Sequence, residues 1–155
     1  MNLSDKELER ILECYTPEYR FLRSIKTNYP KAEAVFNINK SWYLTVDLNH
    51  FTVIENYFCL NQFGLSAILG WLKEKKIPGL KISPERYLEI FEHNTFINES
   101  SVRFKRIVDP DAPVKGYLEA IKTRRIKNLH IGYLDYSFNE GLVYGKALFS
   151  LKIPQ

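Results

Sequence analysis

The sequence contains little cysteine, few histidines and no long uncharged apolar run. Its 155 residues include only two cysteines, Cys14 and Cys59, and three histidines. Two cysteines suit a reducing compartment and do not supply the disulfide framework of a small secreted protein. No histidine or cysteine spacing predicts a metal site. The longest apolar stretch meets the charged segment 73–76 before it reaches the length of a membrane span.

The amino-terminal residues also lack the basic and apolar regions of a secretory signal. Together with the sparse cysteines, this predicts a cytoplasmic location. The chain is 45% hydrophobic and 14% aromatic, which is typical of a globular protein rather than a disordered one. Its length predicts one domain over residues 1–155.

The net charge of +4 is small, and one basic cluster stands out. This cluster is formed by Lys122, Arg124, Arg125 and Lys127. It is interpreted either as a solvated strand edge or as a contact for an anion, such as the phosphates of coenzyme A or an acidic carrier protein. No nucleic-acid-binding motif accompanies it, so we expect no nucleic-acid partner.

The most informative segment is a predicted helix from Thr52 to about Lys75. Apolar residues fall on nearly all of its sides, which predicts a buried helix. Thr52 and Glu55 have the spacing of a capping box at its start. Asn61 and Gln62 are adjacent amides in this apolar context. Buried amides need hydrogen-bond partners, and a substrate carbonyl is one candidate beside the backbone and water.

Caps, turn residues and apolar alternation predict the other elements. Helices are expected from Ser4 to about Glu13 and from Ser83 to about Glu92, and strands at 32–38, 41–47, 95–108, 114–126, 129–138 and 142–153. A buried helix followed by three or four meandering antiparallel strands predicts a sheet wrapped around that helix. This is the hotdog arrangement, of the α+β class. Such sheets commonly join edge to edge, so we expect a dimer or an assembly of dimers.

Several segments resemble the FcoT-type fatty acyl-CoA thioesterases over nearly the whole chain. These segments are 8–22, 41–44, 50–55, 59–63 with 66–67, 100–105 and 151–154. The resemblance implies a hotdog enzyme, assembled from dimers, that hydrolyses acyl thioesters without the usual catalytic carboxylate. It also implies that Tyr15, Tyr43 and Asn61 line the site. Thr52 stands where relatives carry Asn, and both residue types cap helices well.

Hydrolysis of a thioester requires a polarised carbonyl, a positioned water and a departing thiolate. Oxyanion donors each contribute about 10²–10³ in rate, and a thiolate with a conjugate acid pKa of about 8.5 leaves readily. We therefore expect no cofactor beyond the coenzyme A or phosphopantetheine of the substrate. Asn61, Tyr43 and Tyr15 are the expected catalytic residues. The expected substrate-binding residues are Thr52, His50, Glu55, Gln62, Phe58, Leu65 and Arg103.

Other interpretations stay open at this point. Glu55 is either a general base or a cap residue, and Gln62 contacts either substrate or backbone. The pair His50-Phe51 is similar to hotdog hydroxyacyl dehydratases, which also need an acidic residue further along the helix. No Asp or Glu occurs between Asn56 and Lys73, which argues against dehydration. The alternatives are thus dehydration, hydration or addition on a carrier-bound β-substituted acyl group, as in some lipopeptide-pathway relatives, and a non-catalytic acyl-binding protein.

Overall fold

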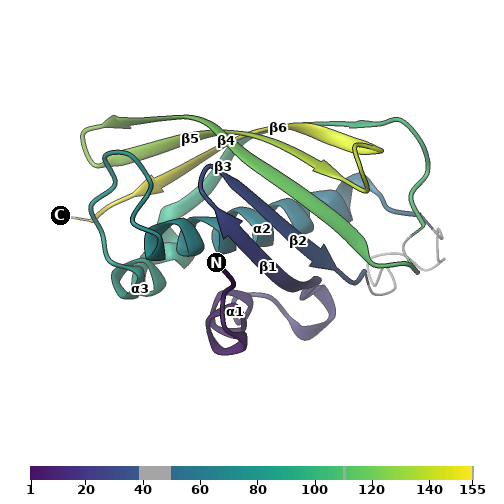
Figure 1. The fold of residues 1–155 in the computed structure, drawn as a ribbon, viewed down its shortest axis with the longest axis horizontal. Coiled ribbons are helices and arrows are strands. Elements are labelled where there is room, and N and C mark those ends of the chain that lie inside the picture. Colours follow the sequence, from purple (N-terminus) through teal and green to yellow (C-terminus); the bar gives the residue numbers. More distant parts are fainter. Residues whose placement is uncertain (39–49, 110, 155) are drawn as a thin grey trace.

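The fold is a single curved antiparallel sheet with one long helix against its concave face (Figure 1). The computed structural model describes residues 1–38, 50–109 and 111–154. The helical elements are α1 (Asp5–Leu12), the 3₁₀ helix η1 (Pro17–Tyr19), α2 (Val53–Lys73) and α3 (Pro84–Asn94). The strands are β1 (Leu22–Asn28), β2 (Lys31–Phe36), β3 (Thr95–Phe104), β4 (Val114–Ile126), β5 (Leu129–Phe138) and β6 (Val143–Lys152).

The strand order in the sheet is β1-β2-β4-β5-β6-β3. Strands β4, β5 and β6 form the predicted meander. The meander therefore has three strands, the smaller of the two predicted numbers, because strand β3 pairs with β6 rather than with β4. The chain leaves β3 at one edge of the sheet and passes the start of α2, where the Phe51 N–H donates to the Val108 carbonyl, before β4 begins. The sheet edges are therefore β1 and β3.

Strand β1 was not predicted from the sequence. Its inward residues, Leu22 and Ile25, are three positions apart, because the pairing with β2 shifts register between Leu22 and Ser24. This irregularity removes the strict two-residue alternation by which a strand is recognised. The predicted strand at 41–47 lies outside the described residues.

Helix α2 is buried along most of its length, as its apolar composition predicts. Its carboxyl-terminal half lies between the sheet and the helices α1 and α3 (Figure 1). Its first turns are different, because Val53, Ile54 and Tyr57 are exposed. In the described part of the chain, no helix combines the length and apolar character needed to cross a membrane.

Local sequence signals determine where the helices begin. Thr52 and Glu55 form the predicted capping box, Ser4 and Glu7 form a second one at the predicted start of α1, and Ser83 caps α3. Each box satisfies amide donors that the first helical turn leaves unpaired. The turn 139–141 between β5 and β6 has positive φ at all three residues, as expected of an Asn-Glu-Gly hairpin turn.

A polar network crosses from α2 to the sheet. The Asn56 amide donates to the Tyr136 hydroxyl at 3.2 Å, and that hydroxyl donates to the Ser101 carbonyl at 2.8 Å. Gly145 lies against both partners. A Cβ atom there would stand 1.8 Å from the Ser101 oxygen and 2.8 Å from the Tyr136 hydroxyl. The close approach of β3 and β6 at this point therefore requires glycine.

Replacement of Gly145 by Ala is expected to lower the free energy of unfolding by about 3 kcal/mol or more, because backbone must move to admit the new atom. Urea unfolding measures this loss. Gly132→Ala is the matched strand control, since its Cβ would meet only Leu134, at 3.8 Å. Equal stability of the two variants would contradict the close approach at Gly145.

Candidate active site

The structure brings Asn61 and Tyr15 together. Asn61 lies on α2, and Tyr15 lies in the segment between α1 and η1. The Asn61 side-chain amide donates to the Tyr15 hydroxyl oxygen at 2.6 Å. Both side chains are partly buried, so they are neither sealed in the core nor freely solvated. Among the described residues, this is the hydrogen bond that joins two of the predicted catalytic groups.

Aromatic rings enclose this pair on one side. The Phe58 ring stacks on Tyr19 with centroids 4.9 Å apart and meets the edges of Tyr15 and Phe21. Burial among these groups raises the pKa of the Tyr15 phenol well above its usual value. The phenol therefore stays protonated at neutral pH. Because its oxygen accepts from Asn61, its own proton is available for donation to a ligand.

Gln62 contacts backbone, which was one of the two interpretations of this residue. Its side-chain oxygen accepts from the Phe21 and Leu22 backbone N–H groups, each at 3.0 Å. Its amide donates to the Tyr19 carbonyl at 2.5 Å. The side chain is fully buried. Gln62 therefore ties η1 and the start of β1 to the helix, and this attachment holds the Tyr15–Tyr19 segment beside Asn61.

Glu55 and Thr52 form the cap at the start of α2. The Glu55 carboxylate accepts from the Thr52 backbone N–H at 2.9 Å and from the Thr52 hydroxyl. Glu55 is only 1% exposed, and this burial keeps solvent from its carboxylate. The geometry therefore agrees with the capping interpretation of Glu55. His50 is half-buried and borders a hollow of about 480 Å³ that also includes Lys105 and Arg106.

Phe58 and Leu65 differ in their surroundings, although both were expected to bind substrate. Phe58 lies in the aromatic group beside Tyr15. Leu65 is buried in a second apolar cluster under α3, where its carbonyl accepts from the Tyr87 hydroxyl at 3.0 Å. Leu65 therefore belongs to the α2–α3 packing.

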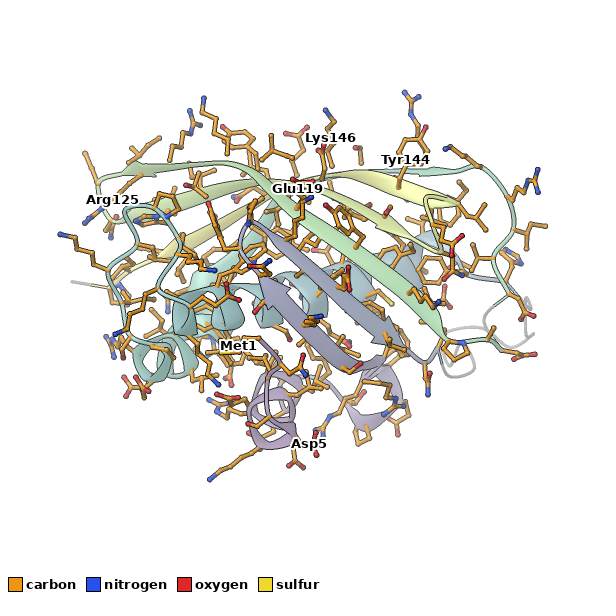
Figure 2. All side chains as sticks on the ribbon, viewed as in Figure 1. Met1, Asp5, Glu119, Arg125, Tyr144 and Lys146 are labelled. Atoms are coloured by element: carbon orange, nitrogen blue, oxygen red, sulfur yellow. The ribbon has the colours of Figure 1, made fainter. Side chains whose placement is uncertain are left out.

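The expected phosphate contacts lie away from the Asn61–Tyr15 pair. Arg103 is exposed on β3 and faces Tyr144 across the β3–β6 pairing. Tyr144 and Lys146 project from the side of the sheet opposite α2 (Figure 2). The basic cluster of residues 122–127 lies at the exposed end of β4. The structure of one chain therefore brings neither group to the pair.

Tyr43, the third predicted catalytic residue, lies outside the described residues, and its role stays a prediction. Asn56 is a polar residue that the sequence analysis did not single out. It is 3% exposed, and its side-chain oxygen has no hydrogen-bond partner in the described part of the chain. A third amide in an apolar helix was the available signal, since buried amides need partners.

Cys59 is fully buried on α2. Burial, followed by the charge of Glu55, raises the pKa of its thiol well above the usual value. A thiol that stays protonated is a weak nucleophile, so Cys59 acts as a small apolar residue of the core. Within residues 1–38, 50–109 and 111–154, no group of three histidine, cysteine or acidic residues has the arrangement of a metal site.

Solved structures share the fold over nearly the whole chain. A mutant thioesterase from Pseudomonas aeruginosa has a TM-score of 0.57 at 9% identity, covering 97% of this chain and 96% of its own. A hypothetical thioesterase from Streptococcus pneumoniae, solved with coenzyme A, has 0.55 at 10% identity and covers 95% and 96%. A thioesterase superfamily protein from Shewanella loihica has 0.53 at 8% identity and covers 86% and 91%. At such low identity these similarities show the hotdog fold alone.

No curated protein matches the chain. The model of the FcoT-like thioesterase domain, however, matches residues 10–142, which include Tyr15, the whole of α2 and most of the sheet. This match supports thioester hydrolysis as the general activity. The chain belongs to the FcoT-like thioesterase domain family.

Proposed function

We propose that this protein hydrolyses acyl thioesters of coenzyme A or an acyl carrier protein. The observation that carries the proposal is the 2.6 Å hydrogen bond from Asn61 to Tyr15 on a partly open face of α2. It leaves the phenolic proton of Tyr15 free to be donated to substrate. It also leaves the other donor and acceptor positions of the Asn61 amide free for substrate and water. The sparse cysteines support a cytoplasmic location, and the family match supports a place in fatty acyl metabolism.

The Tyr15 hydroxyl donates to the thioester carbonyl oxygen, where negative charge develops during attack. The hydrogen bond from Asn61 orients this hydroxyl and makes it a better donor. The Asn61 side-chain oxygen accepts from the attacking water. Phe58 and the neighbouring rings exclude bulk solvent from this side, which strengthens both contacts. Tyr43 stays a predicted third member of the site.

No carboxylate is needed as a strong base in this scheme. Water forms the new carbon–oxygen bond, the carbon–sulfur bond breaks, and the thiolate leaves with the sulfur electron pair. The proton lost by water ends on that thiolate, since thiols have a pKa of about 8.5. The products are a carboxylic acid and a thiol. The use of Glu55 in the helix cap is compatible with this scheme.

Asn61→Ala is expected to lower kcat by about 10²-fold, the usual effect of one lost oxyanion or water contact. Its thermal midpoint should stay near wild type because Asn61 is only partly buried. Gln62→Leu is the neighbouring control. It removes three hydrogen bonds to backbone groups, at about 1 kcal/mol each, and should cost about 3 kcal/mol of unfolding free energy. Full activity of Asn61→Ala on every acyl-CoA tested would refute the assignment.

Tyr15→Phe keeps the ring packed on Phe58 and removes the donor. We expect kcat/KM to fall about tenfold or more, since a lost donor to a developing charge weakens the transition state. The raised pKa of Tyr15 predicts how the rate depends on pH. The phenol stays protonated as pH rises through its ordinary value of about 10, so the wild-type profile should show no loss of rate there from ionisation of Tyr15. A drop near pH 10 that disappears in Tyr15→Phe would contradict the raised pKa, and unchanged kcat/KM in Tyr15→Phe would contradict the role of Tyr15 as a donor.

We also propose that the protein is a dimer joined through β3. This strand is a sheet edge, and β-strand edges are templates for pairing. Exposed apolar residues lie on it and on the first turns of α2: Val53, Ile54, Tyr57, Phe96 and Phe104. Ile54 precedes Asn61 by two helical turns on the same face. A second copy over this surface would therefore help to close the site.

Ile54→Asp is expected to weaken the dimer without harming the helix, because an acidic residue is favourable in a first turn. Sedimentation at several protein concentrations measures the association. Ile121→Asp is the matched control, since Ile121 is exposed on β4, away from β3. If wild type sediments as a monomer at all concentrations, the proposed dimer is wrong.

A further inference from the structure

A small apolar cavity lies between the second half of α2 and the sheet. Its volume is about 50 Å³. One water-sized group needs about 10–15 Å³ by this measure, so the cavity has room for about four such groups. Ile68 and Trp71 form its helix side, and Gly132, Leu134 and Phe149 are among its sheet side.

The cavity is aligned with the proposed site along the helix. Ile68 follows Asn61 by seven residues, so the two lie on nearly the same face of α2, about 10 Å apart along its axis. A fully extended chain of single bonds covers about 10 Å in roughly nine bonds. An acyl chain with its carbonyl at Asn61 would therefore reach the cavity after about nine carbons, with room for three or four more.

Gly64 lies between Asn61 and Ile68 along α2, and Phe149 of β6 packs against it. A Cβ atom on Gly64 would stand 2.3 Å from the Phe149 ring, so the absence of a side chain is what lets the ring pack there. Phe149 also borders the cavity. This ring is therefore the wall that faces the proposed site, and an aromatic side chain can change its rotamer without moving the backbone.

One buried polar atom on the cavity wall, the Nε2 atom of His130, has no hydrogen-bond partner among the described residues. His130 is 6% exposed. Burial, followed by the charge of Arg125, lowers its pKa, so the ring is neutral at pH 7. A neutral imidazole has one donor and one acceptor nitrogen, and we assign the proton to Nδ1, which leaves Nε2 as an acceptor. A buried acceptor without a donor costs free energy.

We propose that this cavity binds the distal end of the acyl chain and that His130 Nε2 accepts a hydrogen bond from a hydroxyl group at that end. The inference rests on the proposed thioesterase function. It assigns the substrate class as acyl thioesters of about twelve carbons, since roughly nine reach the cavity and three or four fill it. A terminal hydroxyl would give the chain a specific partner in an otherwise apolar pocket.

Chain-length selectivity tests the cavity. Gly132 shares the inward face of β5 with His130 and Leu134 and has ordinary space for a side chain. Gly132→Val should therefore fill the cavity while the sheet stays intact, which its thermal midpoint checks. The measurement is kcat/KM of wild type and Gly132→Val on a series from butyryl-CoA to palmitoyl-CoA. We expect the two proteins to have the same kcat/KM for the shortest chains. For dodecanoyl-CoA we expect a loss of about tenfold or more, since each buried methylene contributes about a factor of four. An identical chain-length profile in both proteins would overturn the inference while leaving hydrolysis established.

A binding measurement that does not depend on turnover tests the cavity separately from the proposed activity. Trp71 borders the cavity, and Trp42→Phe leaves it as the remaining tryptophan. Dodecanoyl-CoA with bromine on its terminal carbon should quench Trp71 fluorescence, and Gly132→Val should abolish the quenching. Quenching without turnover would support the pocket and refute the thioesterase. Absence of quenching in both proteins would refute the pocket.

His130→Leu tests the hydroxyl contact. In wild type, terminally hydroxylated dodecanoyl-CoA should have a kcat/KM about fivefold above that of dodecanoyl-CoA, the worth of one ordinary hydrogen bond. In His130→Leu the order should reverse, because the hydroxyl then enters an apolar pocket without a partner. Equal preference in wild type would overturn the role of His130.

Discussion

The attachment of β1 to the buried helix through Gln62 is the contact on which the rest of the site depends. One side chain satisfies two backbone donors and one backbone carbonyl where η1 turns into the first strand. Because these groups are buried, no water can replace the amide without a cost in free energy. The preceding residues are thereby held against α2, and Tyr15 meets Asn61. The same contact thus serves the sheet edge and the proposed chemistry.

The three side-chain amides of α2 contact three different parts of the structure. Asn56, Asn61 and Gln62 point in different directions, because successive residues are rotated by about 100° around the axis. Asn56 faces the sheet through Tyr136, Gln62 faces η1 and β1, and Asn61 faces Tyr15. Two of them meet structural groups. Asn61 is partly exposed, and it is the one that we propose to contact substrate.

The two halves of α2 have different environments. The second half is enclosed by the sheet, α1 and α3, and the cavity beside Ile68 and Trp71 lies there. The first turns present apolar side chains to solvent beside the unpaired edge of β3. A dimer through that edge and an acyl chain running toward the enclosed end would use opposite ends of the same helix. Asn61 lies between them.

The sequence by itself determined the elements that local signals specify. Capping boxes marked the starts of α1 and α2, the Ser83-Pro84 pair marked α3, and alternation with turn residues placed β4, β5 and β6. The family resemblance directed attention to Asn61 and Tyr15, which lie 46 positions apart. Only the tertiary structure decided that β3 pairs with β6, that Gln62 binds backbone, and that Arg103 lies opposite Tyr144 in the β3–β6 pairing. Pairing and side-chain partners depend on residues far apart in the chain, and local periodicity carries no information about such contacts.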